Sequence, residues 1–213
     1  MAKRNTVTVT GTAEVEAEPD RATIRFEATA SDPERKKAYD RVVRAQAALV
    51  RVLDAHEVPA RDRQTASVFV YERRDPKRGE VRDHLASCTT TVRMQAADRI
   101  GELIDAAVRE AGIQVSGPNW YVSREHPART EAYREAARDA QGRAAAYAAG
   151  LGLELGPVVN AEEASSSFGP VMRSLAAPAA AVAEPIEVAP GTVQVSAGVR
   201  AVFELRRGEA VPG

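Results

Sequence analysis

The chain has 213 residues, which suits one large domain or two closely packed subdomains. Its 29 Lys and Arg residues nearly balance 30 Asp and Glu residues, and the net charge of −1 gives no electrostatic reason to expect a nucleic-acid partner. The single cysteine, Cys88, excludes an internal disulfide and a zinc site built from several cysteines.

The amino-terminal residues 1–5 pass directly into an alternating segment, without the apolar run that a signal peptide needs. The longest apolar stretch, residues 175–183, contains Pro178 and is too short to span a bilayer. We therefore expect no membrane span and a cytoplasmic location for the chain as given.

Two segments of period-two alternation, residues 6–17 and 21–30, flank the turn sequence Glu18-Pro19-Asp20. Apolar and polar side chains take opposite faces of each segment, as in half-buried strands. This arrangement predicts an antiparallel hairpin.

The period then changes to that of a helix ending near His56, with Asp32 as its expected N-cap and Pro33 in its first turn. A second strand pair is expected at residues 63–71 and 81–96. Asp98 is expected to cap the helix that Gly112 ends. The expected inner stripe of the first helix is Ala38, Val42, Ala45, Leu49, Val52 and Leu53, and its outer face carries Arg35, Lys37, Arg41, Arg44 and Arg51.

Residues 113–123 predict a fifth strand, which Gly117-Pro118 assigns to a sheet edge or a bulge. A long helix follows at residues 128–149 and a sixth strand at 153–163. Residues 164–190 are rich in Ala, Ser and Pro and predict a long mobile loop. The stripe of the long helix is expected to be Tyr133, Ala136, Ala137, Ala140, Ala144, Tyr147 and Ala148.

A final strand at residues 193–205 completes the order ββα, ββα, βα, ββ, with mostly antiparallel strands and three helices. The expected fold class is α+β, in one domain over residues 1–213 or in two packed subdomains. The residues expected in the core are Val7, Val9, Ile24, Phe26, Leu49, Leu103, Val195, Val199 and Phe203.

Four segments, in this order, resemble the SIMPL-domain family. The first is residues 7–15 with the turn Glu18-Pro19-Asp20, and the second is residues 62–65 before a strand reaching Tyr71. The third is Ala136-Ala137-Arg138-Asp139-Ala140, followed by Ala144, Gly150 and residues 155–158. The fourth is Pro185-Ile186, followed by residues 190–199 and 203–205. The family takes its name from a signalling molecule that associates with a pelle-like kinase. The resemblance implies a bacterial protein linked to oxidative-stress defence, usually exported and without established catalytic residues.

No residue pattern indicates catalytic chemistry. His56, His84 and His126 lack the short spacing of a zinc motif, and the successive carboxylates Glu162 and Glu163 point to opposite faces of a strand. Residues 62–65 are typical of a turn entering a strand, which we prefer to acid–base chemistry there. The serines at residues 165–167 lack the Gly-x-Ser-x-Gly elbow of a hydrolase. Gly150 and Gly152 follow a helix instead of preceding one, so they do not form a phosphate-binding loop.

Two side chains have a functional alternative to packing. Cys88 shares a strand face with Val92 and Met94, which favours a buried thiol, although a redox role stays open. Trp120 is expected in the core, although Trp120-Tyr121 would also suit a binding surface. We assign no catalytic, cofactor-binding or metal-ligating residue and expect no cofactor.

The hypothesis that these observations favour is a non-enzymatic structural or interaction protein that forms homo-oligomers and is linked to stress defence. One alternative is a binding module for a peptide or small apolar ligand that uses the 164–190 loop. Another is an enzyme whose site is assembled from distant residues.

Overall fold

The structure is a computed structural model that describes residues 5–95, 98–164 and 188–207. The predicted loop therefore lies, apart from its ends, outside the described residues, as do its apolar side chains between Phe168 and Ile186. The elements are β1 (Thr6–Ala17), β2 (Arg21–Asp32), α1 (Arg35–Ala55), the short 3-10 helix η1 (Ala60–Asp62), β3 (Arg63–Arg74), β4 (Val81–Met94), α2 (Ile100–Ala111), β5 (Gln114–Tyr121), α3 (Pro127–Gly150), β6 (Glu154–Glu163) and β7 (Val193–Arg206).

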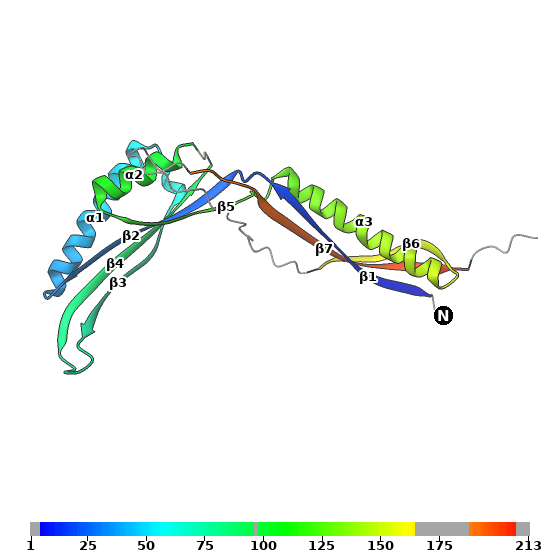
Figure 1. Cartoon of the computed structure of the whole chain (residues 1–213), viewed down its shortest axis with the longest axis horizontal. Coiled ribbons are helices and arrows are strands. Elements are labelled where there is room, and N and C mark those ends of the chain that lie inside the picture. Colours follow the sequence, from blue (N-terminus) through cyan, green and yellow to red (C-terminus); the bar gives the residue numbers. More distant parts are fainter. Residues whose placement is uncertain (1–4, 96–97, 165–187, 208–213) are drawn as a thin grey trace, which may run out of the picture. The chain divides into compact units, whose positions relative to one another are not determined.

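The α+β class and the predicted element order are confirmed (Figure 1). The strands form two antiparallel sheets, in the orders β1-β7-β6 and β3-β4-β2-β5. The chain divides into two compact units: β1, α3, β6 and β7 form the first, and the remaining elements form the second.

The predicted hairpin between the first two strands is wrong. β1 pairs along its whole length with β7, from Thr6 opposite Glu204 to Ala17 opposite Val193. β2 instead lies between β4 and β5. The faces of both strands follow the predicted alternation, but alternation identifies the buried face of a strand and not the strand that lies beside it.

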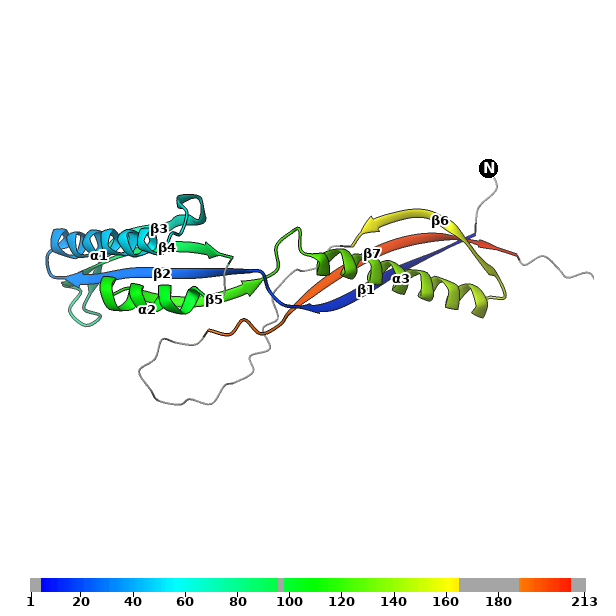
Figure 2. The ribbon, with the colours of Figure 1, turned by 90° about the horizontal axis from the view of Figure 1, so that it is seen from above.

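In the second unit, α1 and α2 lie on one face of the four-stranded sheet (Figure 2). The central strand β2 buries Ala22, Ile24, Phe26 and Ala28 under them. β5 lies at the sheet edge and its pairing with β2 shifts register beside the cis Gly117-Pro118 bond, as that dipeptide predicted.

The ends of two helices differ from the expected caps. Asp32 belongs to β2, where its carboxylate accepts a 2.9 Å hydrogen bond from the backbone N–H of Glu34. The N-cap of α1 is Glu34, two residues later than expected, and the helix starts at Arg35. Arg99, not Asp98, is the N-cap of α2. Neither N-cap side chain makes a capping hydrogen bond. At the other end of α2, Gly112 ends the helix as predicted, in the left-handed conformation with φ at 61°.

In the first unit, α3 lies against β1 and β7 (Figure 1). Every fourth residue of α3 is a buried alanine: Ala128, Ala132, Ala136, Ala140, Ala144 and Ala148. Tyr133, Ala137 and Tyr147, which we expected in this stripe, are exposed because they fall on the flanks of the helix. Alanine side chains allow the helix axis to come close to the sheet, and opposite Ala136 and Ala140 the strand carries Gly11.

The predicted core is largely confirmed. Seven of its members are buried, namely Val9, Ile24, Phe26, Leu49, Leu103, Val195 and Phe203. Val7 and Val199 are half-buried at the margin of the cluster that Val9 and Phe203 form with α3. None of the helices in the described part of the chain combines the length and apolar composition that crossing a bilayer requires.

Asp139 on α3 accepts a hydrogen bond from a backbone N–H on the open edge of the three-stranded sheet. Its carboxylate accepts a 3.0 Å hydrogen bond from the backbone N–H of Thr12 on the edge strand β1, and it lies 2.9 Å from the Arg143 guanidinium. The Thr12 N–H, and after it Arg143, lower the pKa of Asp139 below its ordinary value. A residue of the family-like segment thus has a structural role.

Replacing Asp139 with Asn should destabilise the protein at neutral pH and have less effect in acid. A lowered folded-state pKa contributes stability above the unfolded pKa, and this contribution is lost as the pH falls through the folded value. Denaturant titrations of wild type and D139N from pH 7 downward measure the difference. Glu135→Gln is the matched control, since Glu135 pairs with Arg138 but receives no strand amide. A stability difference that is the same at every pH would contradict this role.

Candidate functional site

The main candidate site is a groove beside α3 in the first unit. It has a volume of about 330 Å³ and is lined by Tyr133, Ala136, Ala137, Ala161, Glu162, Glu163, Gly198 and Val199. The groove exists because α3 packs chiefly on β1 and β7 and leaves much of β6 uncovered. Sequence reasoning missed it, because its position depends on how the helix lies across the sheet.

The chemistry of this groove is mainly apolar. Alanines, Val199 and the ring of Tyr133 form most of its wall, and two carboxylates lie at the exposed end of β6. Glu163 pairs with Val199 in the ladder and Glu162 with Arg200, so the two side chains take opposite faces, as expected. Glu162 also accepts a 2.9 Å hydrogen bond from the Asn160 side chain. Such a groove suits an apolar side chain or a small apolar ligand.

A second cavity, in the other unit, has a volume of about 230 Å³. Its wall includes His56 at the end of α1 and three arginines, Arg61, Arg93 and Arg99. Arg99 donates a 2.7 Å hydrogen bond to the His56 carbonyl, which ties the end of α1 to the start of α2. The wall also contains Asp62, the last residue of η1 before β3 begins, so residues 62–65 do form a turn entering a strand.

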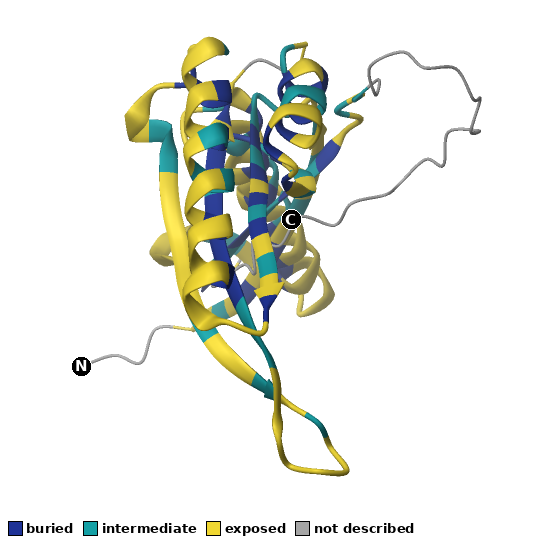
Figure 3. Cartoon of the chain, turned by 90° about the vertical axis from the view of Figure 1, so that its left-hand side faces the viewer, coloured by how far each residue is buried: buried dark blue, intermediate teal, exposed yellow. Residues whose placement is uncertain are grey.

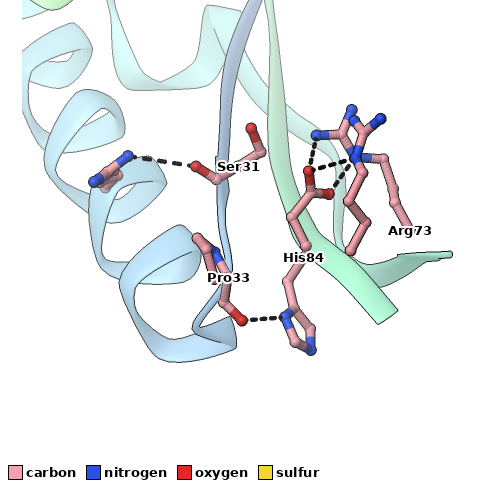
Figure 4. A network of polar contacts seen from close by, with 7 residues as sticks. Ser31, Pro33, Arg73 and His84 are labelled. Atoms are coloured by element: carbon pink, nitrogen blue, oxygen red, sulfur yellow. Dashed lines mark hydrogen bonds and ion pairs between the residues drawn. The ribbon is translucent and has the colours of Figure 1, made fainter. Parts of the chain in front are cut away.

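Each histidine has a local structural role. His56 is the C-cap of α1, and His84 donates from Nδ1 to the Pro33 carbonyl over 3.0 Å (Figure 4). His126 is the N-cap of α3, where its Nδ1 accepts from the Ala128 N–H over 3.2 Å. Within residues 5–95, 98–164 and 188–207, no three His, Cys, Asp or Glu side chains form a group suited to a metal ion.

The other singled-out residues are placed as follows. Trp120 is buried opposite Ala22, which confirms core packing, and Tyr121 is half-buried. Gly150 and Gly152 follow the buried part of α3 in an ordinary helix end. Residues 165–167 lie outside the described residues.

Cys88 is buried on β4, on the sheet face that α1 covers, with Ala28 and Val68 opposite it. Burial raises the pKa of its thiol above the ordinary value. A raised pKa keeps the sulfur as the less reactive thiol at neutral pH.

Cys88 should therefore react slowly with a disulfide reagent in native buffer and rapidly in denaturant. The chain has no other cysteine, so the absorbance of the released thiolate reports on Cys88 alone. Equal rates under both conditions would contradict the buried assignment and favour a redox-sensing thiol.

Comparison with known proteins gives a match over almost the whole chain. The model of the SIMPL family, described as a protein of unknown function, matches residues 7–203. The uncharacterized protein YggE of Edwardsiella ictaluri (strain 93-146) is 27% identical over 167 residues, which cover 77% of this chain and 70% of that protein. The uncharacterized protein YggE of Escherichia coli (strain K12) is 23% identical over 203 residues, covering 93% and 82%.

Proposed function

We propose that this chain, which belongs to the SIMPL family, is a non-enzymatic interaction protein that assembles with copies of itself. The observation that carries the proposal is the apolar character of uncovered sheet edges. The edge strand β3 exposes Val68, Phe69 and Tyr71, and the edge strand β6 exposes Val158 and Val159. An exposed apolar edge strand is a template for pairing with another chain.

A further open edge supports the proposal. β7 pairs with β1 from Val193 onward but with β6 only from Val199 onward. In the sheet pairing of the described residues, the start of β7 therefore has a strand neighbour on one side only. The chain between β6 and β7 consists of residues 164–192. β6 ends opposite Val199, so about six extended residues, at about 3.3 Å each, would be enough to reach the level of Val193. This connection is long enough to contact another subunit.

Light scattering during size-exclusion chromatography should show a native oligomer, and deletion of residues 168–184 should lower its subunit count. A native protein that remains monomeric at high concentration would refute self-assembly. If the deletion leaves the count unchanged, the connection is not the assembly element, and Val68→Lys should then reduce the count because an edge lysine opposes strand pairing. Val108→Lys is the control, since Val108 is exposed on α2 and not on a sheet edge.

A second candidate function is binding of a peptide or small apolar ligand in the groove beside α3. The volume and apolar wall of the groove favour it. A ligand-dependent rise in melting temperature that Ala161→Phe abolishes would support this function. The implied link to stress defence is compatible with either function and requires no reactive Cys88.

A further inference from the structure

The charges of α1 are strongly unbalanced. All its charged side chains are exposed: the cations Arg35, Lys36, Lys37, Arg41, Arg44 and Arg51, and the acids Asp40 and Asp54. The comparison with α3 is informative, because three of its four arginines form ion pairs with an acid about one turn away on the same helix. These pairs are Arg134–Glu131, Arg138–Glu135 and Arg143–Asp139.

Few of the α1 cations have an acidic partner. Lys37 lies 2.6 Å from Glu34 and Arg41 lies 2.9 Å from Asp32. Arg44 donates to the carbonyl oxygen of Asp40 over 3.3 Å, which leaves its charge uncompensated. Over the ranges that the structure describes, Arg35, Lys36, Arg44 and Arg51 form no ion pair.

The position of these charges opposes helix stability. Arg35, Lys36 and Lys37 occupy the first turn of α1, which has no acidic residue. The amino end of a helix carries a partial positive charge, so cations there are unfavourable, and of these three only Lys37 pairs with an acid, the N-cap Glu34. A sequence that breaks a local rule without compensation inside the fold often does so for an external partner.

Apolar side chains accompany the cations on the exposed surface of α1. Tyr39, Val43 and Val50 are 47%, 45% and 40% exposed. They lie on the flank of α1 toward β3, because Asp54, one helical turn beyond Val50, pairs with Arg63 of β3 over 2.6 Å. Figure 3 shows that the outer surface of the helix is exposed while its inner side is buried against the sheet.

We propose that this surface of α1 binds the anionic headgroup region of a phospholipid bilayer as a peripheral contact. The unpaired cations would meet lipid phosphates, and Tyr39, Val43 and Val50 would reach the boundary of the acyl chains. A nucleic acid would engage the cations but leave the valines in water, so the combined surface favours lipid. This contact needs no spanning helix and does not depend on self-assembly.

Flotation of the full chain with vesicles tests the proposal. The protein should bind vesicles of phosphatidylglycerol mixed with phosphatidylcholine, should not bind phosphatidylcholine alone, and should be released by high salt. Each cation near an anionic surface raises partitioning about fivefold, so removing two of them in R44Q/R51Q should lower the bound-to-free ratio about 25-fold. The matched control is R134Q/R138Q on α3, which removes the same charge and should bind as wild type. Circular dichroism checks that both variants are folded.

Three outcomes would overturn the proposal. They are equal binding to neutral and anionic vesicles, equal loss in the two arginine variants, and tighter binding to a single-stranded oligonucleotide than to anionic vesicles. Y39S/V43N separates the two anionic partners further, because it should weaken binding to vesicles and leave binding to an oligonucleotide unchanged. An unchanged affinity of Y39S/V43N for vesicles would count against insertion of the helix flank.

Discussion

Replacing Gly11 with alanine should lower the free energy of unfolding by about 3 kcal/mol, the upper end of the usual range for overpacking a core. A Cβ atom at this position would lie 2.7 Å from the Cβ of Ala140, and closer still to the Ala136 carbonyl oxygen and the Ala140 backbone nitrogen. Backbone atoms of a packed helix cannot move aside as a flexible side chain can, so the helix must shift. Denaturant titration followed by circular dichroism measures the loss.

Two further variants show whether the close approach of helix and strand is the cause. Gly142 lies inside α3, and a Cβ atom added there would extend into open space, so Gly142→Ala should be neutral or stabilising, since alanine favours the helix by up to about 1 kcal/mol. Ala140→Gly added to Gly11→Ala should recover little stability, because the nearest obstructions are backbone atoms. Full recovery would show that the side chain of Ala140, and not the backbone of α3, limits the approach.

The contact between Gly11 and α3 explains part of what the sequence could reveal. The alternation of β1 placed Gly11 on its apolar face, and the alanine-rich stripe of α3 is compatible with close approach to either a sheet or another helix. Nothing local indicated that these two segments meet, because the contact joins residues far apart in the chain. The error in the strand partner has the same origin: the Glu18-Pro19-Asp20 turn is equally compatible with a hairpin and with a strand that passes from one sheet to another.

The candidate site was less predictable than the fold. Burial of Cys88 followed from its strand face, whereas the backbone partners of His84 and His126 could not be read from the sequence. The groove beside α3 depends on which strands the helix covers, and periodicity within an element carries no information about lateral placement. The unpaired charges of α1 were visible as a basic outer face. The lack of acidic partners for four of these cations, within the described residues, could be seen only once the neighbouring elements were placed.

Replacing Phe26 with alanine should lower the free energy of unfolding by about 3–5 kcal/mol, as expected when a large aromatic side chain is removed from a core. Phe26 is fully buried on the central strand β2, with Thr90 and Val115 opposite it on the two neighbouring strands. Because both sides of the strand are fixed by pairing and the face is covered by helices, the site has little freedom to collapse around the cavity. Trp120 is the only tryptophan and is buried in the same sheet, so its fluorescence during denaturant titration reports on this unit.

Phe69→Ala is the matched control for this prediction. Phe69 lies on the edge strand β3 of the same sheet, stacks on Tyr71 with ring centroids 5.7 Å apart, and is 41% exposed. Its removal should lower the free energy of unfolding by only about 0.5–1.5 kcal/mol, the contribution of an aromatic pair, because the site is open to water. Equal losses for the two variants would contradict the burial assigned to β2. A loss below about 1 kcal/mol for Phe26→Ala would place that residue outside the core, since truncation of a buried phenylalanine does not fall so low.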